Sequence, residues 1–183
     1  MNTNILSTPF KKPVELAVSG TTEKVFQDSA AAAVVLPLPS ASQLCGADSA
    51  KSAARFKVVA IGRVEGGTAT NFTVKLYYGT STTVASDTIV EASSARAVDS
   101  AKHNWMIEAD LTWDSDSNKL QGWGRSEVAS LYDVEATIDT AGGITSVDPD
   151  ASGTLGFVVS GTFSVSNSGN KAYLDSFVLI SMA

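Results

Sequence analysis

Few side chains in this sequence are of the types that carry chemistry. There is one histidine, His103, and one cysteine, Cys45. A histidine-paired nucleophile, a Cys/His zinc site and a site with two histidine ligands each need a further residue of these types in the same subunit. We therefore interpret Cys45 as a small apolar residue and His103 as a surface or capping residue. The sequence predicts no catalytic, cofactor-binding or metal-ligating residue, and no enzyme activity.

Four acidic residues lie close together and could supply the paired carboxylates of a glycosidase. They are Glu108, Asp110, Asp114 and Asp116. The first three share one face of an alternating segment whose other face is apolar. A solvated sheet face explains these residues more simply, and this is the interpretation that the sequence favours.

The segment Asp114-Ser115-Asp116-Ser117-Asn118 resembles the opening of a calcium loop, in which alternate oxygen ligands converge on the cation. Such a loop needs glycine where this chain has Lys119, and glutamate where it has Arg125. A polar hairpin turn between two strands accounts for the same residues. The sequence therefore favours a turn over a metal site.

The three tryptophans, Trp105, Trp113 and Trp123, could form a stacking platform for sugar rings. Trp105 and Trp113 share a face with Ile107 and Leu111, which predicts that both pack in the core. Trp123 lies between two glycines and is the better candidate for exposure.

These residues need strands to position them, and the sequence from about 55 to 181 reads as a series of strands. Period-two alternation is strongest in residues 103–114, with apolar side chains on one face. The predicted strands are residues 56–61, 71–78, 103–114, 120–123, 134–138, 155–163 and 172–180. Without amphipathic helices between them, they predict an all-β, antiparallel two-sheet sandwich that is jelly-roll-like.

Residues 1–54 read differently from the body, residues 55–183. They contain four of the five prolines, and their four lysines balance four acidic residues, whereas the body carries the whole net charge of −6. Residues 13–18 and 32–38 suit extended segments, and short helices at residues 30–33 or 43–54 are alternatives. We predict an extended N-terminal arm that docks on another protein, so that residues 55–183 would stay folded without it.

Composition narrows the classes of function. The 183 residues are 44% hydrophobic and 17% charged, which is typical of a folded protein. The negative charge argues against nucleic acid as a partner. No apolar run reaches the ~20 residues of a membrane span, and we expect no secretory signal. The lone cysteine fits assembly in a reducing cytosol.

Three segments, residues 72–79, 105–114 and 172–179, together with the neutral arm, resemble the head decoration or cement proteins of tailed bacteriophages. The resemblance implies a β-sandwich bound to the outside of an icosahedral capsid, where the arm staples subunits of the major capsid protein. It implies a homo-oligomer, with a trimer favoured, and a place on the virion surface. No catalytic residue or cofactor carries over.

Other functions stay open at this point. Within a virion, the chain would also suit a tail, fibre or spike component. From a different class, a carbohydrate-binding β-sandwich module is the alternative, and an enzyme ranks third. Exposed aromatic residues and binding of soluble glycans would favour the module, whereas an arm that orders only on a capsid would favour decoration.

Overall fold

Alternating apolar and polar residues produce long strands here, because successive side chains of a strand point to opposite faces. The computed structural model describes residues 3–5, 13–16, 20–27, 33–45, 53–79, 84, 87–137, 143–150 and 156–182. Its elements are β1 (Thr3–Ile5), β2 (Val14–Glu15), β3 (Lys24–Val25), β4 (Val35–Pro37), α1 (Ala41–Cys45), β5 (Ala53–Glu65), β6 (Thr70–Gly79), β7 (Thr88–Ala92), β8 (Arg96–Val98), β9 (His103–Asp114), β10 (Lys119–Val128), β11 (Leu131–Thr137), β12 (Gly156–Phe163) and β13 (Lys171–Met182). Each strand predicted for the body coincides with one of these, while β7 and β8 are additions that the alternation does not reveal.

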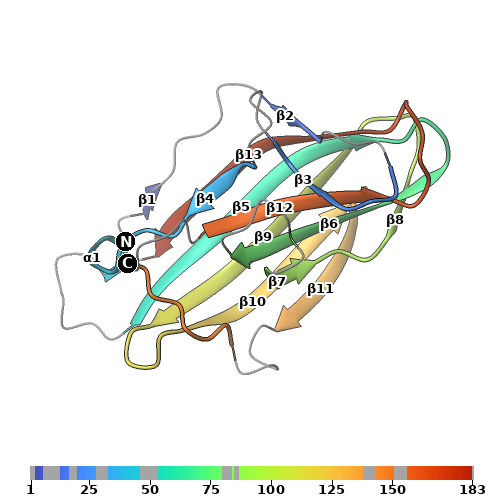
Figure 1. Ribbon diagram of the computed structural model, residues 1–183. Coiled ribbons are helices and arrows are strands. Elements are labelled where there is room, and N and C mark those ends of the chain that lie inside the picture. The colour runs from blue at the N-terminus through green and yellow to red at the C-terminus, as the bar shows by residue number, and fades with distance from the viewer. Residues whose placement is uncertain are drawn as a thin grey trace.

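The strands form two antiparallel sheets that face each other (Figure 1). The larger sheet has the order β1-β13-β5-β9-β10-β11, with β2 also paired to β13. The smaller sheet, nearer the viewer in Figure 1, has the order β3-β12-β6-β7, with β4 also paired to β12 and β8 to β6. The chain passes repeatedly from one sheet to the other, as in jelly-roll arrangements. The predicted two-sheet antiparallel sandwich is confirmed.

The core between the sheets is rich in aromatic side chains. Trp105 is 1% exposed and stacks on Phe26, with ring centroids 5.6 Å apart. Phe56 of the larger sheet meets Phe157 of the smaller one edge-on at 6.2 Å. Trp113 is 4% exposed, and its indole N–H donates to the carbonyl of Val147 at 2.9 Å. Trp105 and Trp113 are therefore core residues, as the sequence indicates.

The described parts of the predicted arm lie on the sandwich itself. The strands β1 and β2 pair with β13, and β3 and β4 pair with β12, so that this segment lines one edge of both sheets. Five of its side chains belong to the core and are at most 7% exposed: Leu16, Phe26, Leu36, Leu38 and Leu44. The physical reason is that the segments around β2, β3 and β4 add apolar side chains to a core that the long strands leave open at this edge. The described parts of the segment therefore pair and pack within their own chain.

The helix α1 is short and begins with a capping box. The backbone N–H of Ser40 donates to the side-chain oxygen of Gln43 at 3.0 Å, and the N–H of Gln43 donates to the Ser40 hydroxyl at 3.4 Å. This reciprocal arrangement satisfies backbone donors that a helix start otherwise leaves free. The predicted helical turn of residues 43–54 is thus found earlier, at residues 41–45, while residues 46–52 lie outside the described chain.

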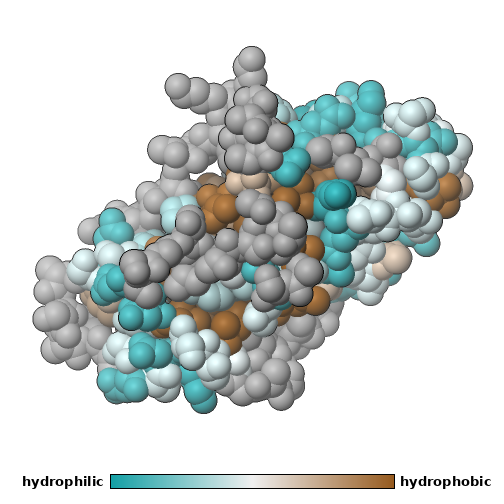
Figure 2. Space-filling view, in the orientation of Figure 1, coloured by the Kyte–Doolittle hydropathy of each residue, from teal (hydrophilic) through white to brown (hydrophobic). Residues whose placement is uncertain are grey.

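The outer face of the smaller sheet carries a second, small apolar cluster. Val25, Tyr77 and Val158 are each at most 5% exposed there, and Val35 packs against them. Figure 2 shows apolar atoms gathered over the middle of this face. The segment that contains β3 and β4 therefore covers the outside of the smaller sheet as well as its edge.

A network of hydrogen bonds to Glu23, the residue before β3, holds this strand next to the cluster. Glu23 accepts hydrogen bonds from Tyr77 at 2.8 Å, from Lys75 at 2.9 Å and from the hydroxyl of Ser160. Burial opposes ionisation of Glu23, but the hydrogen bonds from Ser160, Lys75 and Tyr77 outweigh it and hold the carboxyl pKa below its usual 4.5. The same burial and the neighbouring carboxylate raise the pKa of Tyr77. The ionised form of Glu23 is the one that stabilises the fold.

This network predicts a pH-dependent stability. Because the folded pKa of Glu23 is lowered, its contribution is complete above the unfolded value near 4.5 and is lost as the pH falls below it. We expect Glu23→Gln to lower the free energy of unfolding by about 1 kcal/mol near pH 7. Denaturant unfolding at several pH values should show this gap closing below pH 4.5. The exposed Glu15→Gln, in the same N-terminal segment, is the control; a Glu23→Gln gap that stays constant down to pH 3 would contradict the assignment.

Candidate functional site

The outer face of the larger sheet brings together charged residues from its three central strands. In one row across β10, β9 and β5, Trp123 lies opposite Asp110, which lies opposite Lys57. In the adjacent row, Arg125 lies opposite Glu108. Side chains directly opposite each other in a sheet are close enough to interact. We call the following six residues the outer cluster: Arg55, Lys57, Glu108, Asp110, Trp123 and Arg125.

Ion pairs connect five of these six residues. The guanidinium Nε of Arg125 lies 2.5 Å from Oε1 of Glu108. The ammonium of Lys57 lies between the two carboxylates, 3.4 Å from Glu108 and 3.3 Å from Asp110. Arg55 approaches Asp110 to 3.8 Å, which is an ion pair but beyond hydrogen-bonding distance. Each carboxylate is therefore held by two cations.

The carboxylates and the cations differ sharply in exposure. The side chains of Glu108 and Asp110 are each 7% exposed, whereas those of Arg125 and Arg55 are 46% and 60% exposed. The predicted solvated acidic face is thus wrong for Glu108 and Asp110. Long basic side chains from the strands on both sides reach the two shorter acidic ones. Solvent meets the cations and the tryptophan of the cluster, and the carboxylates lie beneath.

One acceptor in the cluster is left without a hydrogen bond. Within the described residues, Oδ1 of Asp110 is buried and has no hydrogen-bond partner. A buried, ionised oxygen without a donor is costly, and such groups are rare in folded proteins. Lys57 contacts the other oxygen of this carboxylate, and the largely exposed Arg55 lies 3.8 Å from Oδ1. The cluster therefore contains a carboxylate oxygen, Oδ1 of Asp110, that could accept a hydrogen bond, and beside it the guanidinium of Arg55, which does not donate one to it.

Trp123 is exposed, as the sequence indicates, and the two glycines beside it make its position possible. Its exposed fraction is 37%. A Cβ atom at Gly122, whose φ is 153°, would lie 2.0 Å from the carbonyl oxygen of Asp110. A Cβ atom at Gly124 would lie 2.6 Å from the buried carboxylate of Glu91. Glycine at both positions lets β10 lie close to its neighbours while the indole projects from the opposite face.

Of the carboxylates that suggested a glycosidase or a calcium loop, Glu108 and Asp110 both contact Lys57, whereas Asp114 is bound within its own turn. Asp114 stands at the turn between β9 and β10, where it accepts hydrogen bonds from the backbone of Asp116 at 2.9 Å and the hydroxyl of Ser117 at 2.6 Å. These bonds, that of Ser117 first, lower the pKa of Asp114. Among the described residues, no group of three or more His, Cys, Asp or Glu side chains is placed to hold a metal ion. A hairpin turn, with Asn118 at a φ of 50°, accounts for this segment.

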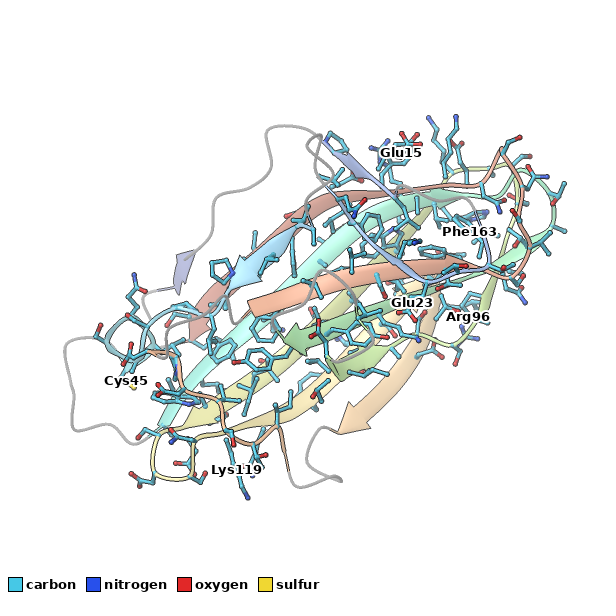
Figure 3. The ribbon with its side chains drawn as sticks, viewed as in Figure 1. Glu15, Glu23, Cys45, Arg96, Lys119 and Phe163 are labelled. Atoms are coloured by element: carbon cyan, nitrogen blue, oxygen red, sulfur yellow. The ribbon has the colours of Figure 1, made fainter. Side chains whose placement is uncertain are left out.

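His103 and Cys45 make their contacts outside the outer cluster. The imidazole of His103 contacts Asp99 at 2.9 Å across a surface turn. This contact, followed by the backbone N–H of Ala101, lowers the pKa of Asp99. Cys45 ends α1 and packs, half-buried, against the core. Figure 3 shows it at the opposite end of the sandwich from Glu15.

A pocket of about 420 Å³ opens at the end of the larger sheet near β2 (Figure 3). Its lining residues are Pro13, Glu15, Arg63, Val64, Glu65, Lys102 and Tyr173. Arg63 is committed within the protein, since Asp175 binds its guanidinium twice at 2.7 Å and the group lies 5.2 Å from the centre of the Tyr173 ring. The remaining charges in the lining are of both signs and favour no ligand class. The outer cluster is the better defined candidate site.

Comparison with known proteins adds an architectural similarity. No protein-family model matches the chain, and neither does any curated protein sequence. Among solved structures, it is similar to a legume lectin-like domain from Entamoeba histolytica, with 7% identity over 97% of this chain and 89% of that one, and a TM-score of 0.40. It is also similar to a lectin from Bauhinia forficata in complex with GalNAc, with 12% identity over 100% and 92% of the two chains, and a TM-score of 0.31. Identities and TM-scores this low carry nothing about what this chain binds, so its function has to follow from its own residues.

In the described part of the chain, α1 is the only helix, and no helix there has the length and apolar character of a membrane span.

Proposed function

We propose that this protein is a carbohydrate-binding β-sandwich and that the outer cluster is its saccharide site. The observation that carries the proposal is the exposed indole of Trp123 on the same sheet face as the charged groups of Arg125, Lys57 and Arg55. A pyranose ring has apolar C–H faces and a rim of hydroxyls. An aromatic surface binds the faces, and charged or amide groups beside it bind the rim.

The placement of the cluster supports this function. Its residues lie on β5, β9 and β10, which are long central strands of the larger sheet, so the backbone beneath the site is rigid. The buried carboxylates of Glu108 and Asp110 hold the basic side chains in position before any ligand arrives. Groups that are already ordered lose little conformational entropy on binding, and this favours affinity.

Glycan binding can be tested directly. We expect the full chain to bind members of an array of soluble mono- and oligosaccharides, and Trp123→Ala to lose at least tenfold in affinity, roughly the effect of removing a stacking partner. Trp123→Tyr keeps an aromatic face and should retain part of the binding. Thermal melting of both variants should match the native protein, since Trp123 contributes little to the core. Binding of no saccharide, or unchanged binding by Trp123→Ala, would contradict the proposal.

The virion roles predicted from the sequence stay predictions. Of these, a tail, fibre or spike component is the one that a saccharide site would serve, because such a component meets the glycans of a cell surface. The outer cluster thus favours a carbohydrate-binding module, alone or as part of such a structure.

A further inference from the structure

We infer that the saccharide bound at the outer cluster is anionic, carrying a carboxylate or a sulfate group. This inference rests on the proposed function and narrows its ligand class. Its first support is that the basic side chains of the cluster are more exposed to solvent than the acidic ones. Both carboxylates are 7% exposed, and a ligand arriving from solvent meets Arg55, Arg125 and, more deeply, Lys57, whose side chain is 26% exposed.

The excess of cations over carboxylates in the cluster also favours an anionic ligand. The cluster holds three cations against two carboxylates, on a protein with a net charge of −6. Glu127, two residues beyond Arg125 on the same face, is the nearest further charge on β10, and it is half-buried. Thr112 and Gln121, which continue the face on the other side, are uncharged. The positive surface is therefore a small island around Trp123.

The geometry leaves donors available for an anion. Arg125 contacts Glu108 through Nε, and no hydrogen-bond partner of its two terminal nitrogens lies in the part of the chain that the structure describes. Carboxylate and sulfate accept paired hydrogen bonds from such nitrogens. Arg55 is 3.8 Å from Asp110 and is not hydrogen-bonded to it. The two guanidinium groups come from strands on either side of β9. Arg125 lies opposite Glu108 and Arg55 opposite Thr112, and we expect an acid group above β9 to be contacted from one or both sides.

The island also limits the size of the ligand. At physiological salt, charges are screened beyond about 8 Å, so the cluster acts on a group that reaches it and not on a distant polymer. The acidic remainder of the protein repels a long polyanion. A short acidic saccharide, with one sugar ring on Trp123 and its acid group between the arginines, fits both conditions.

Matched saccharides test this inference with the full chain. The probes are a galacturonic acid hexasaccharide, the same hexasaccharide as its methyl ester, and a heparin-derived hexasaccharide, each titrated by calorimetry. We expect at least one acidic probe to bind about tenfold or more tightly than the neutral ester, with affinity falling as salt rises. Preference for the galacturonate shows that a carboxylate is sufficient. Preference for the heparin fragment, which carries sulfates in addition to carboxylates, shows that sulfate contributes to binding.

Single substitutions test which residues of the cluster bind the acid group. Arg125→Gln and Arg55→Gln should each weaken the acidic probe about tenfold and leave the ester nearly unchanged. Arg55 is largely exposed, so its variant folds even if that of Arg125 does not. Lys102→Gln, which removes a cation at the far end of the sheet, is the matched control and should change neither affinity. If the ester or other neutral saccharides bind as well as the acidic probes, the inference is wrong and the proposed function stands; if no saccharide binds at all, the proposed function itself is wrong.

Discussion

Removal of residues 1–45 is expected to abolish the cooperative unfolding of this protein. The deletion takes five side chains out of the core, from Leu16 to Leu44, each at most 7% exposed. At roughly 1.5 to 3 kcal/mol for each buried side chain, the loss is comparable with the 5 to 15 kcal/mol that stabilises a typical domain. It also uncovers the edges of β12 and β13 and one side of Trp105, where Phe26 stacks. This is the reverse of the result expected from the sequence.

Thermal melting and circular dichroism of the shortened chain measure the effect. A shorter deletion, residues 1–5, is the control, since it removes only the pairing of β1 with the end of β13. We expect the control to melt cooperatively and the long deletion to show no transition. A cooperative, β-rich melt of the long deletion would show that residues 53–183 fold independently and would restore the arm interpretation.

Replacement of Trp113 by alanine is expected to lower the free energy of unfolding by about 3 to 5 kcal/mol, the usual cost of removing a large buried aromatic side chain. Trp113 is 4% exposed and donates a hydrogen bond to the carbonyl of Val147 at 2.9 Å. Its loss leaves both a cavity between the sheets and a buried carbonyl without its donor. The segment that contains Val147 should loosen together with the core.

Trp123→Ala is the matched control for this measurement. It removes the same side chain from the outer face, where the indole is 37% exposed, and should cost no more than about 1 kcal/mol in the same denaturant experiment. The two variants together separate the core role of one tryptophan from the surface role of the other. Equal destabilisation would place Trp123 in the core and remove the basis of the saccharide site.

Much of the fold could be predicted because its long strands are regular. In β9 every second residue from Trp105 to Trp113 is apolar, and the structure buries all of them. Because strand periodicity is a local signal, it predicts the strand and its inner face without knowledge of the partners. The exposure of Trp123 followed from its glycine neighbours in the same way.

The outer cluster could not be predicted, because it depends on which strands are neighbours. Lys57 and Glu108 lie 51 positions apart and meet only because β5 pairs with β9. The sequence does not show which carboxylate lies opposite Arg125. Without that pairing, Glu108 and Asp110 read as solvated residues. The alternation of basic residues with apolar ones in β5 was the one local signal available.

The pairing of the N-terminal segment within its own chain could not be predicted, because its strands are too short to show a period. The strands β2 and β3 have two residues each, and each pairs along one side only. Its buried residues Leu16, Phe26 and Leu36 are ten positions apart, a spacing that matches no regular element. Prolines and a neutral charge, which suggested a free arm, are equally typical of edge strands.

The position of β13 between β5 and the N-terminal strands determines when the protein can fold during synthesis. The strands β1 and β2 leave the ribosome long before residues 173–182, with which they pair. The edge of the smaller sheet has the same property, since β3 and β4 pair with β12, which is synthesised much later. A nascent chain of this kind carries the apolar residues of its early strands unpaired until β12 and β13 have been synthesised, and its many distant contacts make folding slow.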